Sequence, residues 1–193
     1  IAGLFLAYLM ARKDFFGKGI IDVLIMQPLV IPPTVLGYYL LSIFGAGSPL
    51  GRLFEAFGLK IVFTWKGAVV AAFISSLPLF VKPARAAIES VGEDLENAAR
   101  LLGKTEFQVL TTITLPLAWR GITAGAVMAF ARSTGEFGAT LMVAGNIPHL
   151  TQTLPIAIYD AVMAGDSATA NLLVGIITVF SFLVLYMAGR FAK

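Results

Sequence analysis

Long apolar runs separated by short polar stretches dominate the chain, and their lengths predict helices that cross a membrane. A transmembrane helix needs about 20 predominantly apolar residues. Four runs reach or approach that length: Ile20–Phe44, Ile61–Val81, Leu117–Ala144 and Ala170–Gly189. Neither internal repeats nor low-complexity segments divide the sequence. The pattern therefore predicts an all-α membrane protein with one transmembrane domain over residues 1–193.

The apolar run at the start of the sequence is too short to cross a bilayer. Ile1–Ala11 is followed by Arg12 and provides roughly half of the residues that a span needs. A secretory signal carries basic residues before its apolar run, whereas here they come after it. We interpret Ile1–Ala11 as the end of a helix that begins outside this sequence. This interpretation brings the expected number of transmembrane helices to about five, with the first one truncated.

Composition supports a membrane protein and excludes several other classes. Hydrophobic residues make up 58% of the chain and charged residues only 13%, with a mean hydropathy of +0.87, whereas soluble domains average about 25% charged residues. The net charge of +3 is small and scattered, so no nucleic-acid partner is expected. Cysteine is absent, and His149 is the single histidine, so we expect no disulfide, metal site or cofactor. We find no Ser-His-Asp set and no paired-carboxylate site, and we therefore do not expect an enzyme.

The basic residues are distributed unequally between the two ends of the predicted helices. Lys and Arg mark the cytoplasmic side of membrane proteins. Alternating the spans places only Arg52, Lys60 and Lys66 on one side and leaves Arg132 inside the membrane. We therefore expect a multi-pass protein of the inner (cytoplasmic) membrane, with residues 45–60 and 147–167 external and irregular and with both tails cytoplasmic. The basic residues assigned to the cytoplasmic side are Arg12, Lys13, Lys18, Lys82, Arg85, Arg100, Lys104, Arg120, Arg190 and Lys193.

Three prolines interrupt the span Ile20–Phe44. Pro28, Pro32 and Pro33 each lack a backbone donor and clash with the preceding turn, so this helix must bend or break. Broken backbone at membrane depth is tolerated where it packs in protein or lines an aqueous cavity. Two interpretations stay open: a kink that improves helix packing, and a segment that lines a pathway.

A charged loop over about residues 83–118 separates two of the apolar runs. It holds five of the 11 carboxylates, at Glu89, Glu93, Asp94, Glu96 and Glu106. Residues 89–102 are predicted to form a short helix, because carboxylates in a first turn suit the helix dipole and Gly103 can end the helix. An apolar stripe recurs at three- and four-residue spacing on that helix, at Leu95, Ala98, Ala99 and Leu102.

The glycine that ends this predicted helix invites a false interpretation. Gly103-Lys104-Thr105 resembles the end of a phosphate-binding loop, but that motif needs a glycine where Ala98 stands, after a buried strand. We therefore exclude nucleotide binding by this chain. Pro116, by contrast, fits the first turn of the next span, where a missing donor costs little.

The span Leu117–Ala144 carries charges within its apolar sequence. A charge near the centre of a membrane costs at least about 2.5–3.5 kcal/mol on insertion scales, so such residues pair or face a cavity. Arg132 and Glu136 are four residues apart and can meet on one helical face, next to Ser133. Either a self-neutralising pair between helices or a role beside a pathway would explain them. Gly121 and Gly125, earlier in this span, would permit close helix contact.

The charged loop resembles the coupling loop of ABC importer permeases. The resemblance lies in Glu96-x-Ala98-Ala99-x-x-x-Gly103 followed by Ile113-x-Leu115-Pro116, with Asn97 as a departure from the commonest form of the motif. In that family the loop docks on a cytoplasmic ATPase subunit. The resemblance thus implies a set of ATPase-coupling residues: Glu96, Ala98, Ala99, Gly103, Ile113, Leu115 and Pro116.

Further segments resemble permeases for tetrahedral oxyanions. GEFGA at residues 135–139 and AGN at 144–146 are shared with sulfate and molybdate permeases, while TLMV at 140–143, TQTLP at 151–155 and QPLVIPPTVLGYYL at 27–40 favour the molybdate and tungstate branch. The resemblance implies the type I permease fold and a pathway enclosed by two copies of the chain within membrane lipid. It also implies two ATPase subunits and an external oxyanion-binding protein. Three alternatives are weighed against it: a sulfate or thiosulfate importer, a passive anion channel and a membrane-embedded enzyme.

Overall fold

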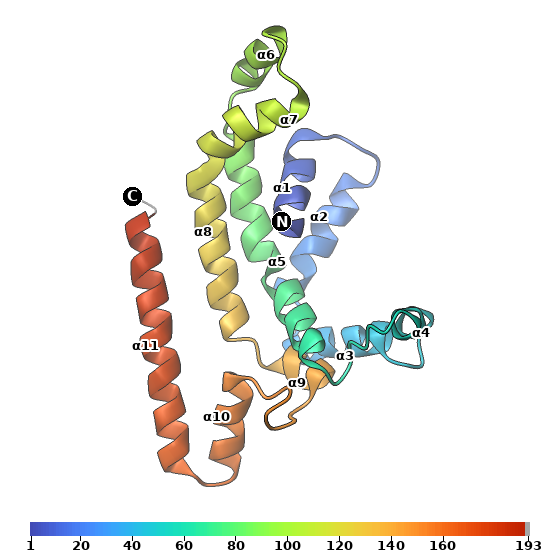
Figure 1. Ribbon diagram of the computed structural model, residues 1–193, viewed down its shortest axis with the longest axis vertical. Helices are drawn as coiled ribbons and strands as arrows, with labels where there is room; N and C mark the ends of the chain where they lie inside the picture. Colours follow the sequence, from blue (N-terminus) through green and yellow to red (C-terminus); the bar gives the residue numbers. More distant parts are fainter. Residues whose placement is uncertain (192–193) are drawn as a thin grey trace.

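The computed structural model describes residues 1–191 and consists of helices joined by turns (Figure 1). Lys193, which the charge distribution assigned to the cytoplasmic side, lies outside the described residues. The helices are α1 (Ala2–Arg12), α2 (Lys18–Met26), the 3-10 turn η1 (Gln27–Leu29), α3 (Pro33–Phe44), α4 (Pro49–Ala56), α5 (Trp65–Glu89), α6 (Glu93–Leu101), α7 (Glu106–Val109), the π-helical turn η2 (Leu110–Thr114), α8 (Leu115–Thr134), α9 (Gly138–Ala144), α10 (Leu154–Met163) and α11 (Ser167–Phe191).

The expected all-α membrane fold is confirmed by the length and composition of these helices. Three helical segments are long and apolar enough to cross a bilayer: Trp65–Glu89, Glu106–Thr134 and Ser167–Met187. A fourth candidate is the pair Lys18–Leu29 and Pro33–Phe44, which is bent by 119° at the proline cluster. Together with the short apolar helix α1, this agrees with the expectation of about five membrane helices, the first of them short.

One predicted span is in fact two helices. The run Leu117–Ala144 breaks after α8 at Thr134, and α9 begins at Gly138. The Glu136 side chain explains the break, because its Oε1 accepts a hydrogen bond from the Ala139 backbone N–H at 3.0 Å and so satisfies the start of α9. The hydrophobic pattern is continuous across this break and therefore could not reveal it.

Two other predicted boundaries are wrong for local reasons. The segment 147–167, expected to be external and irregular, contains α10, whose start after Thr153 has a proline in its first turn. Helix α5 continues past Pro78 and Pro83 to Glu89, so the loop expected over about residues 83–118 is shorter, and most of it is helical.

Helix α5 lies at the centre of the bundle and packs closely against α8. A Cβ on Gly125 would lie 2.9 Å from the Phe80 carbonyl oxygen and 3.0 Å from Pro83 Cγ, and one on Gly121 would clash with Ala87. The two glycines thus permit the close approach that their spacing indicated. The core that α5 and α8 share with α1 and α2 consists of Ala7, Met10, Ile25, Val81, Ala84, Ile88, Val91, Ala118 and Ile122.

A second contact places the broken segment beside the start of α9. A Cβ on Gly37 of α3 would lie 2.6 Å from Met142 Cβ, and one on Gly138 would lie 2.9 Å from Pro33 Cβ. Leu36 and Leu40 pack here with residues of α5 and α9. Helix α3 is therefore held against α9 and the lower part of α5, from which it extends sideways in Figure 1.

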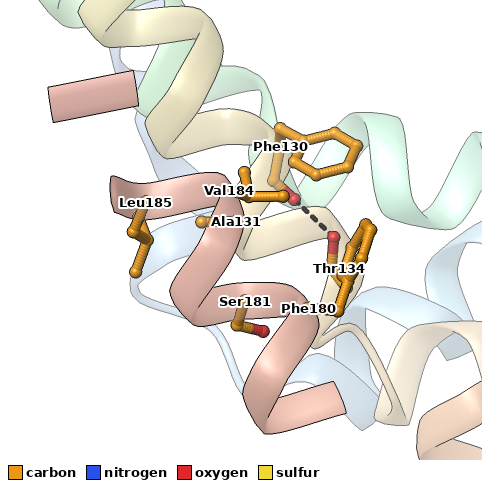
Figure 2. Close-up of a pocket in the computed structure, with 7 residues that line it drawn as sticks. All are labelled: Phe130, Ala131, Thr134, Phe180, Ser181, Val184 and Leu185. Atoms are coloured by element: carbon orange, nitrogen blue, oxygen red, sulfur yellow. Dashed lines mark hydrogen bonds between the residues drawn. The ribbon is translucent and has the colours of Figure 1, made fainter. Parts of the chain in front are cut away.

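Helix α11 stands at the edge of the molecule and is joined to α8 by a small contact. In Figure 2, Phe130, Ala131 and Thr134 of α8 face Phe180 and Ser181 of α11 across a narrow pocket. The Phe130 and Phe180 ring centroids are 6.2 Å apart. Thr134 Oγ1 donates within its own helix to the Phe130 carbonyl at 2.9 Å, drawn as the dashed line. Most of the other apolar side chains of α11 are exposed on the single chain, as suits lipid or a protein partner.

The two ends of the bundle differ in their elements. Figure 1 places α6, α7 and the carboxyl ends of α1, α5 and α11 toward one end, and α3, α4, α9 and α10 toward the other. The first end therefore carries the basic residues that come after α1 and those in the last turns of α5. Arg52, Lys60 and Lys66 lie at the second end. The fold thus separates the two groups of basic residues as the alternating spans predicted.

Candidate functional site

The short helix α6 forms because its ends are satisfied by local sequence. Glu93, Asp94 and Glu96 lie in its first turn and Arg100 in its last, which matches the helix dipole at both ends. Gly103 follows with a φ of +84°, a left-handed conformation that favours glycine. The Lys104 backbone N–H donates to the Ala99 carbonyl at 3.1 Å and closes the helix end.

A second short helix follows at once, with a start signal that the sequence analysis missed. Thr105 and Gln108 form a reciprocal capping box: the Gln108 N–H donates to Thr105 Oγ1 at 3.4 Å, and the Thr105 N–H donates to Gln108 Oε1 at 2.9 Å. The spacing Thr-x-x-Gln is a known start signal and could have revealed α7. From α7 the chain continues through η2 into α8. We call residues 93–114, which comprise α6, α7 and η2, the coupling segment.

The first predicted coupling residue, Glu96, is buried. Its side chain is 2% exposed and accepts hydrogen bonds at Oε1 from Arg12 Nη2 at 2.8 Å and from Thr114 Oγ1 at 2.7 Å. Arg12 also donates from Nε to Glu96 Oε1 at 3.2 Å and from Nη2 to the Val91 carbonyl at 2.9 Å. Glu96 therefore joins α6 to α1 and to η2 rather than facing a partner.

A second, exposed ion pair lies within the coupling segment and is connected to Glu96, because Arg100 Nη2 also donates to Glu96 Oε2 at 3.5 Å. Arg100 donates to Glu106 from Nε at 2.7 Å and from Nη2 at 3.1 Å, and its Nη1 donates to Asn97 Oδ1 at 2.8 Å. The hydrogen bond from Arg100 is the largest influence on Glu106 and lowers the pKa of that carboxyl. Glu106 thus stays ionised at neutral pH and links α6 to α7.

The coupling segment exposes large apolar side chains at the end of the molecule. Leu101 is 90% exposed, Leu102 84%, Phe107 72% and Leu95 54%. Ala98 is exposed as well, but Ala99 is buried at 5%, so the predicted stripe of Leu95, Ala98, Ala99 and Leu102 does not lie on one exposed face. Exposed apolar side chains gathered on a polar segment indicate a surface for another protein.

Of the remaining predicted coupling residues, two pack against the bundle and one is exposed at the surface. Ile113 and Leu115 pack against the core shared by α1, α5 and α8, so they hold the segment to the bundle. Pro116 is exposed in the first turn of α8. The resemblance placed all these residues in one docking motif. It did not indicate Leu101 and Phe107, because their exposure is a property of the folded segment.

Arg132 and Glu136, the charged residues of the third predicted span, lie in contact. Arg132 Nη2 is 2.8 Å from Glu136 Oε2, and the Glu136 side chain is only 1% exposed against 29% for Arg132. Glu136 Oε1 accepts the hydrogen bond from Ala139 that begins α9. Ser133 Oγ donates to the Phe130 carbonyl at 2.8 Å within α8 and does not join the pair.

The structure brings this pair to the proline break. An open cavity of about 270 Å³ has Arg132, Glu136, Pro33 and Thr34 among its lining residues. Pro32 is the N-cap of α3 and Pro33 its first residue, while Pro28 lies in η1 on the other side of the break. About a hundred residues separate the prolines from the charged pair in the sequence, so the sequence pattern did not predict that they meet. Their common cavity is a tertiary feature.

Other polar residues offer no comparable arrangement. His149 is exposed, with a φ of +61° in the turn after Pro148. Within residues 1–191, no group of three or more His, Cys, Asp or Glu side chains is placed to hold a metal ion. The coupling segment and the Arg132 cavity are therefore the two places where the described structure gathers features suited to transport.

Residues 2–193 match the family described as the inner membrane component of binding-protein-dependent transport systems. The chain is 47% identical over 173 residues to the molybdenum transport permease of Escherichia coli K12, covering 88% of this chain and 76% of the relative. It is 42% identical to a putative molybdenum transport permease of Bacillus subtilis, covering 92% and 78%. A sulfate transport permease of Salmonella typhimurium is 32% identical, with 100% and 71% covered.

A solved structure shares the fold at low sequence identity. A bacterial ABC transporter involved in the import of the polysaccharide alginate superposes with a TM-score of 0.74 at 15% identity, covering 98% of this chain and 71% of that one. Fold and sequence similarity agree on one assignment. The chain belongs to the family of inner membrane components of binding-protein-dependent transport systems, among the molybdenum transport permeases.

Proposed function

We propose that the chain is the transmembrane subunit of an ATP-driven importer whose cargo is molybdate or tungstate. The observation that carries the cargo assignment is the 47% identity to a molybdenum transport permease against 32% to a sulfate transport permease. Energy comes from a separate ATPase subunit, and an extracytoplasmic binding protein delivers the anion. The chain itself acts as a transport subunit rather than as an enzyme.

The exposed apolar surface of the coupling segment is the docking site for the ATPase. Leu95, Leu101, Leu102 and Phe107 are exposed, and they belong to α6, α7 and the turn between them. Figure 1 shows these two helices at the upper tip of the molecule. A partner surface that covers them would remove large apolar areas from water, which is the main favourable term in association. Glu93 and Asp94 lie beside this surface and favour basic residues on the partner.

Two copies of the chain enclose the pathway. Each chain carries one coupling segment, and a pair of ATPase subunits therefore requires two permease subunits related by two-fold symmetry. The exposed apolar side chains of α11 and of the broken α2–α3 segment would then face either the second copy or membrane lipid. Arg132, beside the cavity at the proline break, is positioned to attract an oxyanion weakly, and conduction requires such weak binding.

The proposed topology places the coupling segment and the carboxyl end of α11 in the cytoplasm. Because the chain contains no cysteine, single cysteines at Gly47, Glu93 and His149 provide specific reporters. We expect an impermeant maleimide to label positions 47 and 149 in spheroplasts, and position 93 only after the membrane is opened. Labelling of position 93 with protection of 47 and 149 would invert the topology.

The cargo is tested by competition in reconstituted complexes. With the ATPase and the cognate binding protein present, uptake of labelled molybdate should be reduced by excess unlabelled molybdate or tungstate and little by sulfate. Equal competition by sulfate would assign the chain to sulfate or thiosulfate import. Uptake that needs no ATP would instead identify a passive anion channel.

A further inference from the structure

We infer that Arg12 is a positioning residue for coupling, which fixes α6 to the transmembrane core through the buried carboxylate of Glu96. The inference rests on the proposed function, since it assumes that the coupling segment binds the ATPase. It adds a residue outside the coupling motif and assigns Glu96 to the inner face of the segment. Movement of α6 on the ATPase would then reach α1 through this ion pair.

The geometry of the pair suits a rigid connection. Arg12 and Glu96 are 84 residues apart, yet Arg12 approaches Glu96 Oε1 through two donors, Nη2 at 2.8 Å and Nε at 3.2 Å. Arg12 also donates to the Val91 carbonyl, directly before α6. Guanidinium groups hold several acceptors in a fixed planar arrangement, which a lysine cannot reproduce.

Few side chains attach α6 to the core. Gly92 precedes the helix and Gly103 follows it, and a Cβ added to either would meet no atom within 4 Å. Among the side chains of α6 only Glu96 and Ala99 are buried. Glu96 therefore supplies the polar attachment of α6 to the bundle, and Thr114 adds a hydrogen bond from η2 to the same oxygen at 2.7 Å.

Helix α1, which carries Arg12, is firmly packed on α5. Ala7 and Met10 are fully buried in the core, and a Cβ on Gly3 would lie 2.7 Å from the Phe80 ring. Arg12 itself is only 10% exposed. A force on α6 is thus transmitted through Arg12 into the helices that form the membrane core, because tightly packed side chains move together.

The test uses the complete complex of permease, ATPase and binding protein in proteoliposomes. The variants are Arg12→Met, Arg12→Lys, Glu96→Gln and the double Arg12→Met/Glu96→Gln. Two quantities are measured: retention of the ATPase on purification, and ATP hydrolysed per molybdate taken up. We expect Arg12→Met to retain the ATPase but to raise the ATP consumed per anion about 2- to 30-fold, the range for residues that carry coupling. Arg12→Lys should recover part of the loss because it keeps the charge.

The matched control is Arg85→Met, which removes an arginine from its pairs with Glu89 at the end of α5 and with Asp22 of α2, neither of which involves α6, and should leave the ratio unchanged. Should Arg12→Met fail to fold, the double variant leaves no unpaired buried charge and must show the raised ratio instead. An unchanged ratio in the folded variant, or loss of the ATPase from Arg12→Met, overturns the inference. Failure of the proposed docking function is distinct, since the ATPase would then stay bound after alanine replaces both Leu102 and Phe107.

Discussion

Arg132→Ala should sharply lower the yield and thermal stability of the folded permease. It leaves the Glu136 carboxylate 1% exposed and without its cation, and breaking a buried pair in this way costs about 3–5 kcal/mol. Glu136→Gln should be milder, because the amide oxygen can still accept the Ala139 N–H and Arg132 is 29% exposed toward the cavity. The double variant Arg132→Ala/Glu136→Gln should recover part of the stability lost in Arg132→Ala. Detergent-solubilised protein followed by thermal unfolding measures this order.

Uptake measured on the same proteins separates the two roles of Arg132. If the pair serves structure alone, the double variant should regain uptake along with stability. If Arg132 attracts the anion, the double variant should be stable but inactive. Lys18→Ala is the control with the same four-residue spacing: its partner Asp14 is 98% exposed, so stability should stay close to that of the unchanged protein. Arg132→Ala with normal stability and uptake would contradict both roles.

Alanine at Leu102 or Phe107 should weaken ATPase association about tenfold or more. Central apolar residues of an interface contribute about 2 kcal/mol or more each when truncated, and these two side chains are 84% and 72% exposed on the free permease. Neither contributes to the bundle core, so the variants should insert and fold normally. Titration of solubilised permease with the purified ATPase gives the dissociation constants directly.

An equally exposed pair of leucines provides the control for this result. Leu95 of α6 and Leu53 of α4 are both 54% exposed. Helix α6 lies at the top of the molecule in Figure 1, whereas α4 projects from the side of the lower half, away from the coupling segment. Leu95→Ala should weaken ATPase binding and Leu53→Ala should not. Equal effects of the two changes, or full affinity in the Leu102→Ala/Phe107→Ala variant, would exclude the coupling segment as the docking site.

The helix that carries Glu96 could be predicted from the local sequence, but the environment of the Glu96 side chain could not. Acidic residues in a first turn and a glycine after the last predict the helix α6 correctly, because dipole and backbone effects act within one turn. The pattern assigned Glu96 to the docking surface, but the folded chain buries it against Arg12. No local signal indicates this partner, since Arg12 and Glu96 are 84 residues apart and meet only through the packing of α1 against α5.

The break at Gly135 has a similar explanation. The run Leu117–Ala144 reads as one span because apolar periodicity continues across it, whereas Glu136 turns its carboxylate onto the Ala139 amide and starts α9. The proline cluster, by contrast, did predict the break between η1 and α3, since proline disrupts a helix through its own covalent structure. The direction of that break, a bend of 119° between the two helical segments, depends on Gly37 and Gly138 packing against α9 and α3.

The sequence by itself thus determined the helical membrane fold, the segregation of basic residues and the position of the coupling segment. These properties depend on the length of apolar runs, on where charges fall and on turn chemistry, all of which act over a few residues. Tertiary structure alone decided which side of α6 faces water, which cation neutralises Glu96, and that Arg132 lies beside the proline break. Those features depend on side chains far apart in the sequence, and burial assigns their partners only when the helices pack.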